Sequence, residues 1–405
     1  MMEKKKLISE RAHLMCPNMF FGIMIKIDRE FSMQKFEESL QVIQNAHPLI
    51  TACINMKDME HLFYENRTNY QIPWYMEKEK TWEQIFHDIS HNGWDVRKES
   101  LLKVYVFPKE AYFQVLLVVH HILCDGRGLL YLAKELADYY AQGITPAFVE
   151  EKLLERLEDL PSGSALPFFS NYLIKNINKH WNQEKQTVSY DAYLEFEKGF
   201  AAQNPVNRSM LNVSKNNLSE MTGICKANEI SINDYLIAKM MKEEKANKVI
   251  IAADIRGKIK RYKQGSLGNY ATAYSVVIKN PEKDLITLAR QIREKVQRIQ
   301  THPSQEMLVL ACYFAMEPTL IDAVAISSLG KYDSRAGKFT GDKMFGYASR
   351  NGHSITNLGK LESDSIAEGF FVPPASPATR KTWGVLTVNG NMRIVEVSYA
   401  GKSMI

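Results

Sequence analysis

The sequence has little of what marks unusual classes of protein. Its 405 residues include only 14 prolines and 21 glycines, which excludes collagen-like and low-complexity chains. Neither charge dominates, because 51 basic residues stand against 46 acidic ones; this balance excludes a histone-like protein and predicts no nucleic-acid partner. Since 45% of the residues are apolar, the chain can still bury large cores, and its length predicts roughly two to three domains.

Cysteines and long apolar runs are also scarce. The cysteines show no CxxC pair and no Cys/His spacing typical of zinc, which excludes a disulfide framework and favours a reducing cytoplasm. The most apolar run, residues 112–119, is far shorter than the ~20 residues of a membrane-spanning helix, so we expect no membrane span. Charges at Glu10 and Arg11 interrupt the apolar core that a signal peptide needs, so we expect no export signal. The cysteines are Cys16, Cys53, Cys124, Cys225 and Cys312.

Apolar periodicity predicts an α/β protein with mixed sheets and two lobes. In the first lobe, residues 1–165, it predicts neighbouring strands over 101–107 and 112–119, followed by a helix from residue 127. A charged segment, interrupted near Pro161, then leads into the second lobe, residues 166–405. That lobe is predicted to open with a strand over 190–196 and to end in a hairpin that turns at Asn389-Gly390.

One constellation in the chain carries chemistry. The segment His120-His121-Ile122-Leu123-Cys124-Asp125-Gly126 follows an apolar strand directly and precedes a helix. A strand-to-helix turn can hold side chains rigidly at the edge of a sheet. Only histidine titrates near neutral pH without perturbation, so a histidine fixed there is a natural general base for a hydroxyl or an amine.

The residues alone leave other roles open. Asp125 has a purely structural alternative as the N-cap of the following helix, since its carboxylate can accept hydrogen bonds from exposed helix N–H groups. The two histidines could form half of a metal site. No third ligand lies at a useful spacing, however, and we expect no bound metal.

The segment from His120 to Gly126 matches HHxxxDG, the motif of the CoA-dependent acyltransferase superfamily, which includes condensation domains, alcohol acetyltransferases and polyketide-associated acyltransferases. The chain resembles this superfamily over nearly its whole length, with further matches at His47-Pro48, at Asp254-Ile255-Arg256 before Leu267-Gly268-Asn269, and at Asn357-Leu358-Gly359. The resemblance implies two lobes, each similar to chloramphenicol acetyltransferase, with the active site in a tunnel between them. A plant-type enzyme is not expected, because the DFGWG motif is absent.

The resemblance also implies roles for individual residues. His121 is the general base, His120 supports the turn, and Asp125 points away from the substrate and pairs with Arg256 to lock the turn. Cys124 occupies a position that varies in the superfamily, so we expect no nucleophilic role for it.

The tetrahedral intermediate of acyl transfer needs donors for its oxyanion. The candidates are the backbone N–H of Gly126 at the start of the helix and the side chain of Asn357 or Thr356 from the second lobe.

Together these features predict an acyltransferase that uses no covalent acyl-enzyme. The acyl group would move from a thioester, either acyl-CoA or an acyl carrier protein, to a hydroxyl or amine of a small molecule. The CoA or phosphopantetheinyl carrier would be a co-substrate rather than a bound cofactor, and we expect a monomer. The alternative is a non-catalytic, condensation-like protein that binds a thioester or a partner without turnover.

A basic segment after Arg256 is a candidate site for the phosphates of CoA. It has no acidic residue, and lysine and arginine are the usual partners of phosphate. A solvated loop is the alternative explanation for such a run. The candidate phosphate ligands are Lys258, Lys260, Arg261 and Lys263.

Overall fold

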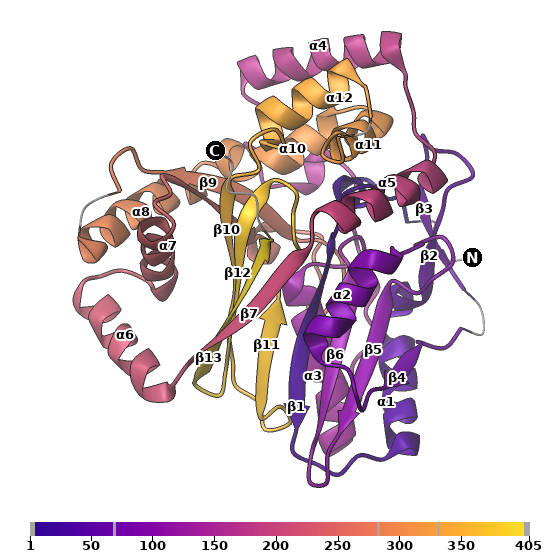
Figure 1. Cartoon of the computed structure of the whole chain (residues 1–405), viewed down its shortest axis with the longest axis vertical. Helices are drawn as coiled ribbons and strands as arrows, with labels where there is room; N and C mark the ends of the chain where they lie inside the picture. Colours follow the sequence, from indigo (N-terminus) through magenta and orange to yellow (C-terminus); the bar gives the residue numbers. More distant parts are fainter. Residues whose placement is uncertain (1–4, 68–69, 282–283, 331, 401–405) are drawn as a thin grey trace.

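Two β-sheets form the framework of the computed structural model, which describes residues 5–67, 70–281, 284–330 and 332–400 (Figure 1). The first sheet has the strand order β11-β1-β6-β5-β4, and the second has the order β7-β13-β12-β10-β8-β9. Both sheets are mixed, since β4 runs parallel to β5 and β10 runs parallel to β8 and β12, whereas β1 and β6 are antiparallel. The predicted fold class is confirmed. The predicted tunnel stays an expectation. Residues 1–4 of the predicted first lobe and 401–405 of the predicted second lobe lie outside the described residues.

The strands of the first sheet are β1 (Phe20–Ile27), β4 (Trp74–Met76), β5 (Leu102–Pro108), β6 (Phe113–His120) and β11 (Glu368–Val372). Those of the second sheet are β7 (Val206–Val213), β8 (Lys248–Asp254), β9 (Ala271–Val277), β10 (Gly352–Leu361), β12 (Thr379–Val388) and β13 (Asn391–Tyr399). A small separate pair consists of β2 (Ala52–Asn55) and β3 (Phe63–Asn66).

The helices of the first half are the short η1 (Ser9–His13) and η2 (Pro48–Thr51), then α1 (Met33–Ala46), α2 (Trp82–Asn92) and α3 (Gly126–Gln142). The later helices are η3 (Leu157–Asp159), α4 (Phe168–Glu184), α5 (Tyr190–Gln203), α6 (Lys215–Ala227), α7 (Ile232–Glu243), η4 (Arg256–Lys258), α8 (Leu285–Gln300), α9 (Pro303–Glu306), α10 (Leu308–Ala315), α11 (Pro318–Ser327), α12 (Arg335–Thr340) and η5 (Gly341–Phe345). No described helix is by itself long and apolar enough to cross a membrane; α10 and α11 meet that test only as a pair bent by 118°.

The second half of the chain contributes one strand to the first sheet. Although β11 belongs to the second half, it pairs with β1 of the first sheet, where Phe370 lies opposite Met24. Its side chain Phe371 and the side chains Leu386 and Val395 of the second sheet share one hydrophobic core with β1 and β6. The division of the chain after residue 165 stays a prediction, and it does not coincide with a boundary between the sheets.

One predicted strand is wrong. Residues 190–196 form the start of helix α5, which Ser189 caps by accepting a hydrogen bond from the N–H of Ala192 at 3.2 Å. Tyr190, Tyr193 and Phe200 are buried on one face of this helix. Their spacing is helical, and the high β-propensity of the aromatic residues concealed this period.

Candidate active site

The HHxxxDG segment forms the predicted strand-to-helix turn. Strand β6 ends at His120, and α3 begins after Asp125, whose extended backbone and carboxylate make it the N-cap. The carboxylate accepts a hydrogen bond from the N–H of Gly128 at 2.9 Å. Asp125 therefore satisfies one of the backbone donors that the first turn of a helix leaves without a partner.

Asn269 determines which nitrogen of His121 carries a proton. The side-chain amide of Asn269 donates from Nδ2 to the backbone carbonyl of His121 at 2.9 Å. Its oxygen Oδ1 therefore faces Nδ1 of the imidazole, 3.0 Å away. Because this oxygen can only accept, Nδ1 holds the proton and Nε2 keeps its lone pair. His121 is thus held in the tautomer that a general base needs.

The surroundings of His121 favour its neutral form. The N–H of His121 donates to the carbonyl of Met19 at 2.8 Å, which places the ring beside β1. Phe21 packs edge-on against the ring, with 4.8 Å between ring centroids. Burial lowers the pKa of His121 below its usual value, because removal from water penalises the charged form. His121 is consequently neutral at pH 7, as a base must be.

His13 is a member of the site that the sequence analysis missed. Its ring stacks on His121, with 4.0 Å between centroids and 17° between the planes. Burial, together with the neighbouring His121 and His120, places the pKa of His13 well below its usual value. No motif marks His13, which lies more than a hundred residues before the turn in the sequence, so no sequence signal was available to find it.

The short helix that carries His13 is held in place by buried charges. Arg11 donates from Nε to Asp322 of α11 at 2.9 Å, and both side chains are almost fully buried. Glu10 of the same helix is completely buried. Burial raises the pKa of Glu10 to about 7, and hydrogen-bonding groups that include the backbone of Asn269 partly offset this effect.

The structure contains the predicted ion pair between Asp125 and Arg256. Two guanidinium nitrogens of Arg256 donate to the two carboxylate oxygens, at 2.9 and 2.8 Å. The N–H of Tyr270 donates to the same carboxylate at 2.7 Å, and Arg256 also contacts Asp254 at 3.1 Å. Burial alone would raise the pKa of Asp125, but Arg256 outweighs this effect and holds the pKa below its usual range. The pair joins the β6–α3 turn to the second lobe.

The other residues of the turn have structural environments. His120 is 5% exposed, packs edge-on against Trp94 and accepts a weak hydrogen bond from the N–H of Ile122 at 3.4 Å. Burial lowers its pKa to about 3, so it stays uncharged. Burial also raises the pKa of the Cys124 thiol well above its usual value, which argues against a thiolate nucleophile.

The predicted oxyanion donors receive unequal support. Gly126 lies at the first turn of α3, and an added Cβ there would come within 2.7 Å of Leu358 of β10, so the second lobe packs directly on this turn. Asn357 uses its side-chain oxygen to accept from the N–H of Gly359 at 2.8 Å, and its Nδ2 is 3.5 Å from Asn233. The roles of Gly126, Thr356 and Asn357 stay predictions.

Three of the four predicted phosphate ligands are already in ion pairs. Nζ of Lys258 lies 2.6 Å from Glu306, Arg261 lies 2.6 Å from Asp159, and Lys263 lies 3.6 Å from Glu150. Within the described chain, no ion pair is seen for Lys260.

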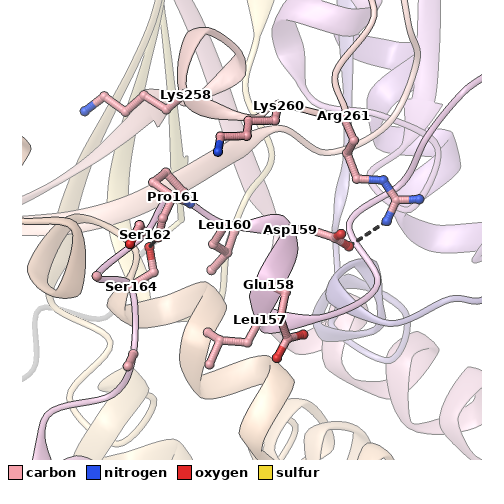
Figure 2. A pocket seen from close by; sticks show the side chains of 12 residues that line it. Leu157, Glu158, Asp159, Leu160, Pro161, Ser162, Ser164, Lys258, Lys260 and Arg261 are labelled. Atoms are coloured by element: carbon pink, nitrogen blue, oxygen red, sulfur yellow. Dashed lines mark hydrogen bonds and ion pairs between the residues drawn. The ribbon is translucent and has the colours of Figure 1, made fainter.

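A cavity of about 420 Å³ lies beside this basic segment (Figure 2). Residues 157–165 line it together with Lys258, Lys260 and Arg261. In Figure 2 the amine of Lys260 lies above Leu160 and Pro161, whereas Arg261 reaches Asp159. An incoming phosphate would therefore meet one unpaired cation here and would compete with carboxylates for the others.

A family model described as "Condensation domain" matches residues 18–311, which is more than half of the chain. The matched span contains the whole HHxxxDG segment, Arg256 and Asn269. None of the curated protein sequences matches this chain.

Solved structures with the same architecture cover nearly the whole chain. Polyketide synthase associated protein 5 from Mycobacterium tuberculosis is 13% identical, with a TM-score of 0.60 over 98% of this chain and 93% of that one. Trichothecene 15-O-acetyltransferase from Fusarium sporotrichioides is 10% identical, with a TM-score of 0.64 over 98% and 90%. The first condensation domain of the CDA synthetase is 10% identical, with a TM-score of 0.61 over 98% and 93%. At these identities the likeness shows the two-lobed fold alone.

Proposed function

The chain belongs to the condensation-domain family, and from this premise we propose that it transfers an acyl group from a thioester to a hydroxyl or amine acceptor. The observation that carries the proposal is the tautomer of His121. Its Nδ1–H donates to Asn269, while its Nε2 has no protein partner among the described residues. The trichothecene 15-O-acetyltransferase that shares the fold supports a hydroxyl as one kind of acceptor.

In the proposed reaction, Nε2 of His121 removes the proton of the acceptor while its oxygen or nitrogen attacks the carbonyl carbon of the thioester. The C–O or C–N bond forms, and a tetrahedral oxyanion results. When this intermediate collapses, the C–S bond breaks and the imidazolium returns the proton to the leaving thiolate. The products are an ester or amide and a free thiol, with no change in oxidation state and no acyl-enzyme.

The N-terminal end of α3, which carries a partial positive charge, is proposed to stabilise the oxyanion. Gly126 is the first residue of that helix, where backbone N–H groups lack intrahelical partners. Such donors, fixed before the reaction starts, are among the largest contributions to acyl-transfer catalysis. The Asp125–Arg256 pair keeps the start of the helix in place, because Asp125 caps it and Arg256 ties the cap to the second lobe.

The donor is proposed to be acyl-CoA, with an acyl carrier protein as the other thioester source. In the basic segment after Arg256, Lys260 is the residue best placed to meet a phosphate, because its neighbours Lys258 and Arg261 already contact carboxylates. Contacts of this exposed kind are screened by salt. A reducing, intracellular setting remains our proposal for where the reaction takes place; the structure shows all five cysteines free.

The test of this proposal is release of thiol from a panel of acyl-CoAs by the purified protein, with His121→Ala as the decisive variant. Loss of a general base typically lowers the rate by about 10²–10⁴-fold. His61→Ala is the matched control, because this histidine is 77% exposed. If His121→Ala keeps activity within tenfold of wild type, His121 is not the base. If wild type binds acyl-CoA but releases no thiol with any acceptor, the protein is a thioester-binding protein rather than an enzyme.

A further inference from the structure

Four aromatic side chains stand in solvent at one end of the molecule. Helix α4 lies across α10, α11 and α12 at the top of Figure 1, on the side away from the lower ends of both sheets. Three of the four aromatics lie in the first two turns of α4, and the fourth lies on α12, which packs against α4. Their exposed fractions are 89% for Phe168, 73% for Phe169, 60% for Tyr172 and 46% for Phe339.

The three aromatic side chains of α4 lie on the face of that helix that does not pack against the rest of the chain. The opposite face of α4 is already buried through Ile174, Ile177 and Trp181, and the indole N–H of Trp181 donates to Thr319 at 3.0 Å. The carboxylate of Glu184 accepts hydrogen bonds from two backbone N–H groups at the start of α12. The helix is therefore fixed in place, and its exposed side has no cover within the described chain. Clustered exposed apolar groups of this kind mark an interaction surface.

The same surface is basic. Lys175 and Lys179 continue the stripe of Phe168 and Tyr172 along α4, at the spacing of one helix face. Lys338 and Arg335 are exposed on α12, next to Phe339. No ion pair is seen for any of these four cations in the part of the chain that the structure describes. Acidic residues also lie nearby: Glu184, which accepts hydrogen bonds from the first two N–H groups of α12, the exposed Asp333, and the half-buried Asp342, four residues after Lys338.

We propose that this aromatic–basic face, made of the exposed residues of α4 and α12 named above, docks the protein on an anionic lipid surface. An interfacial helix places its aromatic side chains at the boundary between headgroups and acyl chains, while lysine stems extend so that their amines reach lipid phosphates. The order on α4, with the aromatics in the first turns and the lysines on the next ones, fits that arrangement. A protein partner fits less well, since lysine is depleted at the centre of protein interfaces. This inference does not rest on the proposed acyl transfer.

The test is sedimentation of the full-length protein with vesicles of phosphatidylcholine alone and with vesicles that also contain phosphatidylglycerol. Wild type is expected to bind the anionic vesicles, and to bind them less in high salt. Phe168→Ser/Phe169→Ser/Tyr172→Ser should weaken binding at least tenfold. Lys175→Gln/Lys179→Gln/Lys338→Gln should also do so, since each lysine near an anionic surface contributes roughly fivefold.

The matched control removes exposed apolar groups elsewhere on the molecule. Ile144 and Phe148 are 52% and 64% exposed and follow α3, so Ile144→Ser/Phe148→Ser should bind vesicles as wild type does. Unchanged thermal melting of every variant would show that each one is folded. The inference is overturned if wild type binds neither kind of vesicle, or if the aromatic variant binds as tightly as the control. It is also overturned if wild type ignores vesicles but forms dimers, or binds an acyl carrier protein, in a way that the aromatic variant abolishes.

Discussion

Replacing Asp125 by asparagine tests whether the ion pair with Arg256 stabilises the site. The carboxylate accepts hydrogen bonds from the guanidinium of Arg256 and from the N–H groups of Gly128 and Tyr270. The side chains of Asp125 and Arg256 are each only 5% exposed, so a charge left without its partner is poorly solvated. Breaking one side of a buried pair costs about 3–5 kcal/mol, because the remaining charge stays buried.

The expected loss for Asp125→Asn lies near the lower end of this range. Arg256 retains Asp254 at 3.1 Å as a second carboxylate, which partly compensates its charge. We therefore expect the free energy of unfolding to fall by about 3 kcal/mol. Arg256→Met should cost a similar amount, and the double variant should cost less than the sum of the two, because the residues contact each other directly.

Urea unfolding of the wild type and the variants measures this difference. The matched control is Asp191→Asn, which removes a 2.7 Å contact to Arg97 at a site where Asp191 is 77% exposed. Exposed pairs contribute little, so this variant should unfold as wild type does. If Asp125→Asn unfolds at the same urea concentration as Asp191→Asn, the buried pair does not stabilise the site and the reasoning is refuted.

The pair also predicts the sign of one pH effect. The pKa of Asp125 is lower in the folded protein than its usual value of about 3.9, so its contribution to stability is fully present above pH ~4. That contribution is lost as the pH falls through the lower, folded pKa. Asp125→Asn should lack this step, and the difference in stability between wild type and variant should therefore shrink in acid.

Three further predictions concern the base and the donor. Asn269→Ala removes the acceptor for Nδ1 of His121, so part of the neutral imidazole should carry its proton on Nε2 instead, and kcat on the plateau of the pH–rate profile should fall at least tenfold. An unchanged kcat would show that Asn269 does not hold the ring. His13→Ala admits water beside His121, which should raise the pKa of His121 and move the acid limb of kcat/KM to higher pH, whereas His13→Phe keeps the stacked ring and should leave the limb in place. Identical limbs in both variants would contradict this role of His13. The third variant replaces the four basic candidates by glutamine: Lys258, Lys260, Arg261 and Lys263. KM for acyl-CoA should rise with little change in kcat, mainly through loss of the unpaired Lys260. An unchanged KM combined with slower use of an acyl carrier protein would point to a docking surface instead.

The sequence by itself determined the local chemistry of the site. Each local feature of the site can be recognised from residues that are neighbours in the sequence. These features are an apolar strand, two histidines, a capping aspartate and an apolar helical stripe. The structure shows all of them between Phe113 and Gln142. The resemblance also predicted the contact between Asp125 and Arg256, because it supplied a long-range pairing that periodicity cannot supply.

Only the tertiary structure decided which residues surround His121 and what the exposed charges contact. His13 and Asn269 reach the same imidazole from sequence positions more than 250 residues apart, and β11 crosses from the second half into the first sheet. The basic segment after Arg256 reads as free cations in the sequence, but carboxylates distant in the chain pair with three of its four candidates. Local patterns follow from backbone geometry and the burial of one face, whereas these contacts depend on how the two sheets pack, which no short stretch of sequence encodes.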